Sequence, residues 1–168
     1  MTLPVRKPNR LSHFDYSTPG AYFLTICVEE KKCILSSIVG GGALDAPLVR
    51  LSKTGQIVQK YIESGNTIPG VTVDKYVVMP NHIHMILFVD ESVSHGTLNA
   101  PSPANSVIPH FVSTFKRFVH RDIGKKIFQR SYHDHVIRGE KDYRKIWQYI
   151  DGNPGKWMDD CFYVEESL

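Results

Sequence analysis

Two histidines separated by one residue are the side chains best suited to chemistry. His82 and His84 lie in a run of branched and aromatic apolar residues, 79–89, which is typical of a β-strand entered through a Pro-Asn turn. In an extended strand, residues two apart point to the same side and lie about 6.6 Å apart, so the two imidazoles share one face. Ile83 and Met85 would then face the core. The spacing therefore predicts a pair of imidazoles that could hold a metal ion.

The histidine pair alone does not define a metal site. Histidines at strand spacing also occur as ordinary surface residues, and a bound cation needs at least one further ligand. The histidine-triad nucleotide-binding pattern would place a third histidine at position 86, where this chain has Ile86, so that pattern does not fit. The three glycines at 40–42 are followed by neither Lys-Ser/Thr nor a G-x-G-x-x-G spacing, which favours a loop over a phosphate cradle.

Size and composition are those of one globular domain. The chain has 168 residues, of which 42% are hydrophobic and 22% charged, and this length can bury a core without disulfides. Cys27, Cys33 and Cys161 form no C-x-x-C pair, so neither a disulfide framework nor a zinc knuckle is predicted. No apolar run suits a signal core or a membrane span. We therefore expect a single domain over residues 1–168 that is cytoplasmic and has no membrane partner.

The formal net charge of +3 is unevenly distributed. Residues 106–138 carry seven lysines and arginines against two acids, and the Pro- and Ser-containing stretch 1–20 is expected to be an irregular basic arm, with a disordered terminus as the alternative. The tail from residue 159 onward carries four acids and no lysine or arginine. Basic stretches of this kind indicate either a solvated face or contact with a polyanion such as DNA.

Apolar periodicity predicts seven elements, and a flexible loop over residues 90–105, which are rich in Ser, Gly, Pro, Ala and Asn. The expected strands cover 21–28, 71–78, 79–89 and 127–137, and the expected helices run from Ser52 to Gly65, over 107–123 and from Glu140 to Asn153.

The first six elements follow the order βαββαβ of ferredoxin-like folds. The predicted fold class is therefore α+β, with an antiparallel sheet, helices on one face and an appended C-terminal helix. In that topology the histidine strand lies centrally beside the first strand, and its open face can receive the appended helix. The apolar stripe of that helix, Tyr143, Ile146, Trp147 and Ile150, is expected to be buried, whereas Tyr149 lies off the stripe.

Two motifs in combination resemble those of the single-tyrosine HUH transposases, specifically the branch of REP-associated tyrosine transposases. They are M-P-N-H-I-H at 79–84 and Y-I-D-G-N-P at 149–154. Further matches are the stretch from D-Y-S at 15–17 to Ile26, and Y-H-D-H-V-I-R at 132–138. The likeness covers nearly the whole chain, and the combination is specific although each piece alone is not.

Carried over position by position, the resemblance implies a metal site and a nucleophile. His82 and His84 correspond to the HUH histidines, and Asn153 corresponds to a third ligand that relatives often supply as Gln. The implied cofactor is a divalent metal, Mg2+ or Mn2+; the softness of imidazole alone favours Mn2+ or a heavier ion over Mg2+, and the sequence does not decide which ion the cell uses. Tyr149, on the appended helix, corresponds to the catalytic tyrosine, which would attack a DNA phosphate and form a 5′-phosphotyrosine intermediate.

The resemblance also implies a partner and an activity. The expected partner is single-stranded DNA with a REP-like hairpin, and the expected activity is nicking near the hairpin followed by strand transfer, by a monomer or a homodimer. Basic side chains would contact the DNA backbone without reading its sequence. The candidates for these contacts are Arg6, Lys7, Arg10, Lys116, Arg117, Arg121, Lys125, Lys126, Arg130 and Arg138.

A second hypothesis is a non-catalytic or domesticated hairpin-binding protein of the same fold. The βαββαβ fold also supports RNA recognition by aromatic stacking. His82 and His84 occupy the face where stacking rings would lie, which favours the enzyme over an RNA-binding module. Cleavage of a hairpin oligonucleotide would separate the two hypotheses.

Overall fold

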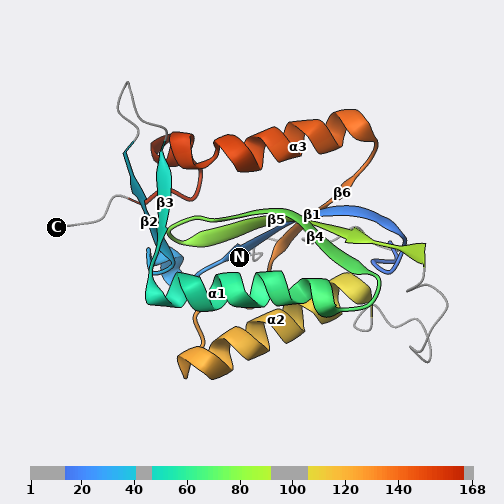
Figure 1. The fold of residues 1–168 in the computed structure, drawn as a ribbon, viewed down its shortest axis with the longest axis horizontal. Helices are drawn as coiled ribbons and strands as arrows, with labels where there is room; N and C mark the ends of the chain where they lie inside the picture. Colours follow the sequence, from blue (N-terminus) through green and yellow to red (C-terminus); the bar gives the residue numbers. More distant parts are fainter. Residues whose placement is uncertain (1–13, 41–46, 92–105, 165–168) are drawn as a thin grey trace, which may run out of the picture.

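Four strands form one antiparallel sheet in the order β4-β5-β1-β6 (Figure 1). The computed structural model describes residues 14–40, 47–91 and 106–164, and the sheet strands are β1 Gly20–Cys27, β4 Val71–Val78, β5 His82–Val89 and β6 His133–Ile137. The histidine strand β5 pairs with β1 over its whole length and with β4 on its other side. This is the predicted ferredoxin-like topology, with the histidine strand at the centre.

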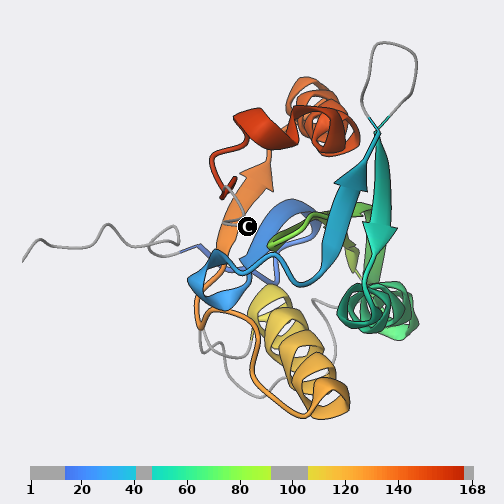
Figure 2. The same cartoon turned by 90° about the vertical axis from the view of Figure 1, so that its left-hand side faces the viewer.

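Helices cover both faces of the sheet (Figures 1 and 2). Helices α1 Lys53–Ser64 and α2 Val107–Ile123 lie together on one face, and α3 Glu140–Gly152 crosses the other. The predicted N-cap of α1 is confirmed, because the Ser52 hydroxyl accepts the Gly55 N–H at 3.0 Å. The predicted α+β fold with an appended C-terminal helix is confirmed.

The main core lies between the sheet and the α1/α2 layer. Ile83, Met85 and Leu87 alternate along β5 onto this face and are fully buried. They pack in one cluster with apolar residues of the helices, including Ile62 and Ile108. Since strand side chains alternate, the same register turns His82 and His84 toward the α3 face.

A two-stranded hairpin was not predicted. Its strands, β2 Ser36–Val39 and β3 Leu48–Leu51, pair with each other and not with the main sheet. The hairpin extends from the beginning of α1 toward the α3 side of the molecule (Figures 1 and 2). Each strand has only four residues and includes polar or exposed positions, so the apolar periodicity that reveals longer strands is too short to detect.

The predicted strand over 127–137 is wrong in its first half. Only His133–Ile137 pairs with β1, whereas Phe128 makes a single bridge to Val28. The carbonyls of 129–131 turn instead toward the ammonium group of Lys116. A side chain from α2 therefore takes the acceptors that a longer strand would have used.

The apolar stripe of α3 is less buried than predicted. Ile150 is buried and Tyr143 and Ile146 are partly covered, but Trp147 is 37% exposed. The Lys75 ammonium lies 3.9 Å from the centre of the Trp147 ring, a cation–π contact that covers part of the indole. Tyr149 lies off this stripe, as the helical angle predicts.

Short 3₁₀ helices complete the described residues: η1 Glu29–Lys31, η2 Gly65–Thr67 and η4 Pro154–Asp159. None of the helices in the described part of the chain has the length and apolarity needed to cross a membrane. The predicted basic arm up to residue 13, with Arg6, Lys7 and Arg10, and the predicted loop from residue 92 to 105 lie outside the described residues.

Candidate active site

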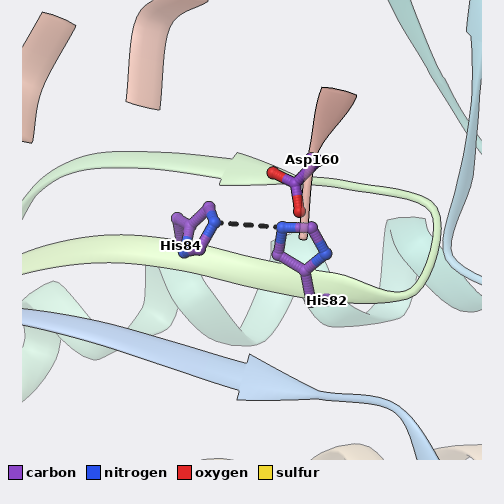
Figure 3. A group of neighbouring side chains, drawn as sticks. All are labelled: His82, His84 and Asp160. Atoms are coloured by element: carbon purple, nitrogen blue, oxygen red, sulfur yellow. Dashed lines mark hydrogen bonds between the residues drawn. The ribbon is translucent and has the colours of Figure 1, made fainter. Parts of the chain in front are cut away.

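Strand β5 brings His82 and His84 together beneath α3, where both side chains are buried. Their Nε2 atoms lie 3.0 Å apart (Figure 3). Aromatic rings flank the pair: the ring centroids are 5.2 Å apart for Phe23 and His84, and 4.6 Å apart for Phe162 and His82. The imidazole pair predicted from the sequence spacing is therefore present, and it is covered rather than exposed on an open sheet face.

A hydrogen bond to Asn81 fixes the protonated nitrogen of His82. The Asn81 Nδ2 donates to the carbonyls of Lys31, at 3.1 Å, and Phe162, at 2.8 Å. The remaining amide atom, Oδ1, lies 2.9 Å from His82 Nδ1 and can only accept. His82 Nδ1 therefore carries the proton, and its Nε2 presents a lone pair toward His84.

Thr25, which contacts His84 Nδ1, can accommodate either tautomer of His84. Because His82 Nε2 accepts, the 3.0 Å contact requires His84 Nε2 to donate in this state, so His84 Nδ1 accepts from the Thr25 hydroxyl at 2.8 Å. A hydroxyl can also accept a hydrogen bond. Thr25 can therefore support the opposite tautomer of His84, in which both Nε2 lone pairs are free to bind a cation.

Helix α3 places Tyr149 against the histidine pair. The Tyr149 hydroxyl lies 3.3 Å from His84 Nε2, and its ring packs edge-on against Phe23 with centroids 6.1 Å apart. The side chain is nevertheless 43% exposed. A phenol from the last helix and two imidazoles from the central strand thus converge, and the phenol remains partly exposed to solvent.

Asn153 and Asp160 complete the cluster. Asn153, one helical turn after Tyr149, is 2% exposed and donates its Nδ2 to Asp160 at 2.8 Å. Its Oδ1 has no hydrogen-bond partner among the described residues. The carboxylate of Asp160 lies above the histidines, and the potential ligand atoms of His82, His84 and Asp160 are within 4.8 Å of one another (Figure 3). A buried oxygen without a hydrogen-bond partner is the kind of group that a bound ion would satisfy.

Asp160 was not found by sequence reasoning. It lies beyond the Y-I-D-G-N-P motif, and the only signal was the acidic character of the tail. Composition gives the sign of a segment's net charge but not where the segment lies in the fold. The turn after η4 brings this carboxylate back over the sheet, which a sequence pattern could not show.

Burial sets the protonation of the site. It lowers the pKa of His82 to about 4, with a smaller lowering from Lys31 and an opposing effect of Asp160. Burial, followed by the proximity of His82, lowers the pKa of His84 well below its ordinary value. Both imidazoles are therefore neutral near pH 7, the state that binds metals. Burial, and then the charge of Asp160, raises the pKa of Tyr149 to about 12, so this phenol needs nearby positive charge to ionise.

These side chains fit a divalent cation. Two ligands held at right angles, each about 2.1 Å from one cation, lie about 3.0 Å apart, and the two Nε2 atoms are 3.0 Å apart. The buried Oδ1 of Asn153, which lacks a partner among the described residues, is a further oxygen donor on the side chain that bonds Asp160. Neutral imidazoles together with oxygen donors suit Mn2+ and related transition metals better than Mg2+.

Lys116, one of the predicted DNA contacts, is engaged inside the protein. Its ammonium donates to the carbonyls of Gln129, Arg130 and Ser131 at 2.7, 3.3 and 3.1 Å. These three bonds use all of its N–H donors. Burial lowers the pKa of Lys116 to about 8. The structure thus gives Lys116 the role of anchoring the segment before β6 to α2.

The other predicted DNA contacts are not gathered around Tyr149. Those on α2 and the loop that follows lie on the opposite face of the sheet from α3 (Figures 1 and 2). Arg121 pairs with Asp122 at 3.2 Å. The predicted contacts that are exposed and make no ion pair with described residues are Arg117, Lys125, Lys126, Arg130 and Arg138.

Comparisons with known proteins support this assignment of the fold. No protein-family model matches the chain. An uncharacterized protein of Haemophilus influenzae is 32% identical, over 95% of this chain and 94% of that protein. The structure is also similar to that of the REP-associated tyrosine transposase bound to a REP hairpin, with a TM-score of 0.62 and 20% identity over 90% of this chain and 74% of the other. The chain therefore belongs to the same family as the Haemophilus influenzae protein, and it has the fold of the REP-associated tyrosine transposase, which confirms the fold implied by the resemblance of its motifs.

Proposed function

We propose that this protein is a metal-dependent enzyme that nicks single-stranded DNA near a hairpin and transfers the strand. The observation that carries the proposal is the convergence of Tyr149 on the histidine pair, with its hydroxyl 3.3 Å from His84 Nε2. Tyr149 is 43% exposed, so its ring contact with Phe23 alone does not account for a tyrosine beside two neutral, buried imidazoles. The similarity in fold to a transposase solved with a REP hairpin supports a transposase-like function.

In this mechanism Tyr149 is the nucleophile. Its Oη forms a bond to the scissile phosphorus, the bond from phosphorus to the 3′ oxygen breaks, and the phenolic proton leaves while the 3′ oxygen gains a proton. The product is a 5′-phosphotyrosine link and a free 3′-hydroxyl. Since one phosphodiester replaces another, a 3′-hydroxyl from a second strand can reverse the step and join the DNA.

The protein side chains prepare this reaction. When bound, a divalent cation would neutralise charge that develops on the scissile phosphate. His82, His84 and Asn153 would hold it, and Asn81 keeps His82 in the tautomer that this requires. The nearby positive charge would also favour ionisation of Tyr149, whose pKa is raised to about 12 without it.

The first test is the covalent adduct. Purified protein with Mn2+ and a hairpin oligonucleotide labelled on the strand 3′ of the nick should yield a protein–DNA band that is stable in denaturing gel electrophoresis. Tyr149→Phe should abolish this band, because the substitution removes the nucleophile and leaves the ring. Hairpin binding, measured by fluorescence anisotropy, should change less than about twofold, since phosphate contacts carry most of the affinity.

The matched control is Tyr143→Phe on the same helix. Tyr143 donates its hydroxyl to Asp74 at 2.7 Å and lies away from the histidines, so this variant should form the adduct at the wild-type rate. An adduct that persists in Tyr149→Phe would refute the assignment of the nucleophile. Binding without an adduct in the wild-type protein would favour the non-catalytic hairpin-binding hypothesis.

A further inference from the structure

Asp160 is the charged group of the site for which the family resemblance supplies no role. It follows η4, and its carboxylate reaches within 4.8 Å of the ligand nitrogens of His82 and His84 (Figure 3). Within the described residues, this is the one cluster of three His, Cys, Asp or Glu side chains with the spacing of a metal site. Proximity alone does not make a ligand, so the way in which the carboxylate is held matters.

The carboxylate is oriented by two donors. Asp160 Oδ1 accepts the N–H of Phe162 at 2.7 Å, and Oδ2 accepts the amide of Asn153 at 2.8 Å. Each carboxylate oxygen has about two lone-pair directions, so both bonds leave capacity for a cation. The Asn153 side chain thus joins the carboxylate, which lies near the imidazoles, to an amide oxygen that lacks a partner among the described residues.

The segment that carries Asp160 is fastened to the histidine strand. Asn81, which precedes His82, donates to the Phe162 carbonyl at 2.8 Å, and Lys31 donates to the Cys161 carbonyl at 3.3 Å. The Phe162 ring also packs on His82 with centroids 4.6 Å apart. Asp160 is therefore held over the site by three contacts on its C-terminal side, and its location does not depend on one flexible side chain.

Charge balance favours a carboxylate among the ligands of a buried dication. Two imidazoles and an amide are neutral ligands, and a buried dication that they alone hold would keep its full charge in a poorly solvated site. A carboxylate lowers that charge and adds the hard oxygen donor that Mn2+ and Mg2+ prefer. We propose, on the basis of the metal site in the function proposed above, that Asp160 is a further ligand of the cation, supplied by the C-terminal segment.

Metal affinity tests this inference independently of cleavage. Mn2+ binding to the full chain without DNA is followed by the loss of the free-ion signal in electron paramagnetic resonance. Asp160→Asn should weaken binding by at least about 10-fold, the lower end of the losses measured when metal-supporting groups are removed. The matched control is Asp159→Asn, because Asp159 is an exposed neighbour with the same charge and should bind Mn2+ as the wild type does.

Further variants separate the possible failures. If Asp160→Asn binds Mn2+ within twofold of the wild type, Asp160 is not a ligand. If the wild type and His84→Ala bind Mn2+ equally weakly, the histidine site itself is refuted, and with it the proposed function. An asparagine at position 160 could turn its NH2 group toward the Asn153 NH2 group, so that two donors face each other. Asp160→Ala avoids this clash and should show the same loss of Mn2+ affinity as Asp160→Asn. Thermal unfolding without metal confirms that each variant is folded.

Discussion

Thr25 has a role in the site that its residue type makes testable. In the hydrogen-bond network its hydroxyl donates to His84 Nδ1, at 2.8 Å, whereas a cation on Nε2 requires the same hydroxyl to accept. Only a group that can both donate and accept serves both states. The switch of His84 between tautomers is thus permitted by Thr25, which is itself buried on β1.

Thr25→Val should therefore lower the affinity for Mn2+ by about 10- to 100-fold, the range typical for loss of a group that orients a metal ligand. Valine has nearly the shape of threonine, so the sheet should remain intact. Thr25→Ser, which keeps the hydroxyl, should restore most of the affinity. Isothermal titration with Mn2+ measures all three proteins, and equal affinity of the valine and serine variants would show that the hydroxyl does not act on His84.

Residue identity and spacing predicted part of this site. His82 and His84 share a face because strand residues alternate, and Tyr149 and Asn153 share one because helix residues four apart do. These relations are local and can be calculated from sequence. The contributions of Thr25 and Asp160 depend on which strands pair and on where the chain turns after the last helix, and neither follows from local spacing.

At the scale of elements, the beginning of α1 is tied to the entry into the histidine strand. The Leu35 N–H donates to the Pro80 carbonyl, and the Leu35 carbonyl accepts the Ser52 N–H, each at 2.9 Å. Helix α1 can approach Leu35 this closely because residue 55 is glycine: a Cβ placed there would lie 2.0 Å from the Leu35 oxygen. Gly55 therefore allows α1 and the Pro80-Asn81 turn to share one backbone segment.

Gly55→Ala should lower the free energy of unfolding by about 1–3 kcal/mol, since backbone must shift to admit the methyl group. Urea denaturation followed by circular dichroism measures the change. Gly152→Ala is the matched control, because a Cβ at Gly152 in α3 meets nothing within 4 Å and alanine favours a helix. Equal free energies of unfolding for the two variants would show that the backbone relieves the close contact with Leu35 without loss of stability.

The long periodic elements were predictable and the short ones were not. The elements with apolar patterns of eight residues or more are the helices α1, α2 and α3 and the strands β1, β4 and β5. Their bounds agree with the prediction within one or two residues, except that β5 begins at His82 and Met79 belongs to the turn before it. The β2–β3 hairpin and the truncated β6 depend on tertiary contacts, such as the carbonyls that Lys116 engages. Patterns over four residues carry too little information to reveal them.

For the molecule as a whole, the predicted DNA contacts on α2 and the loop that follows it lie on the opposite face of the sheet from α3, which carries the tyrosine. A groove of about 630 Å³ between α2 and the segment before β6 is lined by Arg117, Lys126 and Arg130, with Tyr132 and no acidic side chain. Tyr149 lies on the α3 face. In the proposed function, the groove would hold phosphates of the hairpin while the adjoining single strand passes around the sheet to the nucleophile.

This arrangement predicts that binding and chemistry can be separated by charge reversal in the groove. Lys126→Glu or Arg130→Glu should weaken hairpin binding by about 10-fold at low salt and reduce the slope of log K against log salt by about 1, the effect of losing one phosphate contact. Formation of the tyrosine adduct on a short oligonucleotide without a hairpin should be unchanged, and so should Mn2+ binding. Lys53→Glu makes the same charge change at an exposed lysine on α1 and is the matched control. Fluorescence anisotropy across a salt series measures the effect, and an equal loss in Lys53→Glu would show that net charge, rather than the groove, determines hairpin binding.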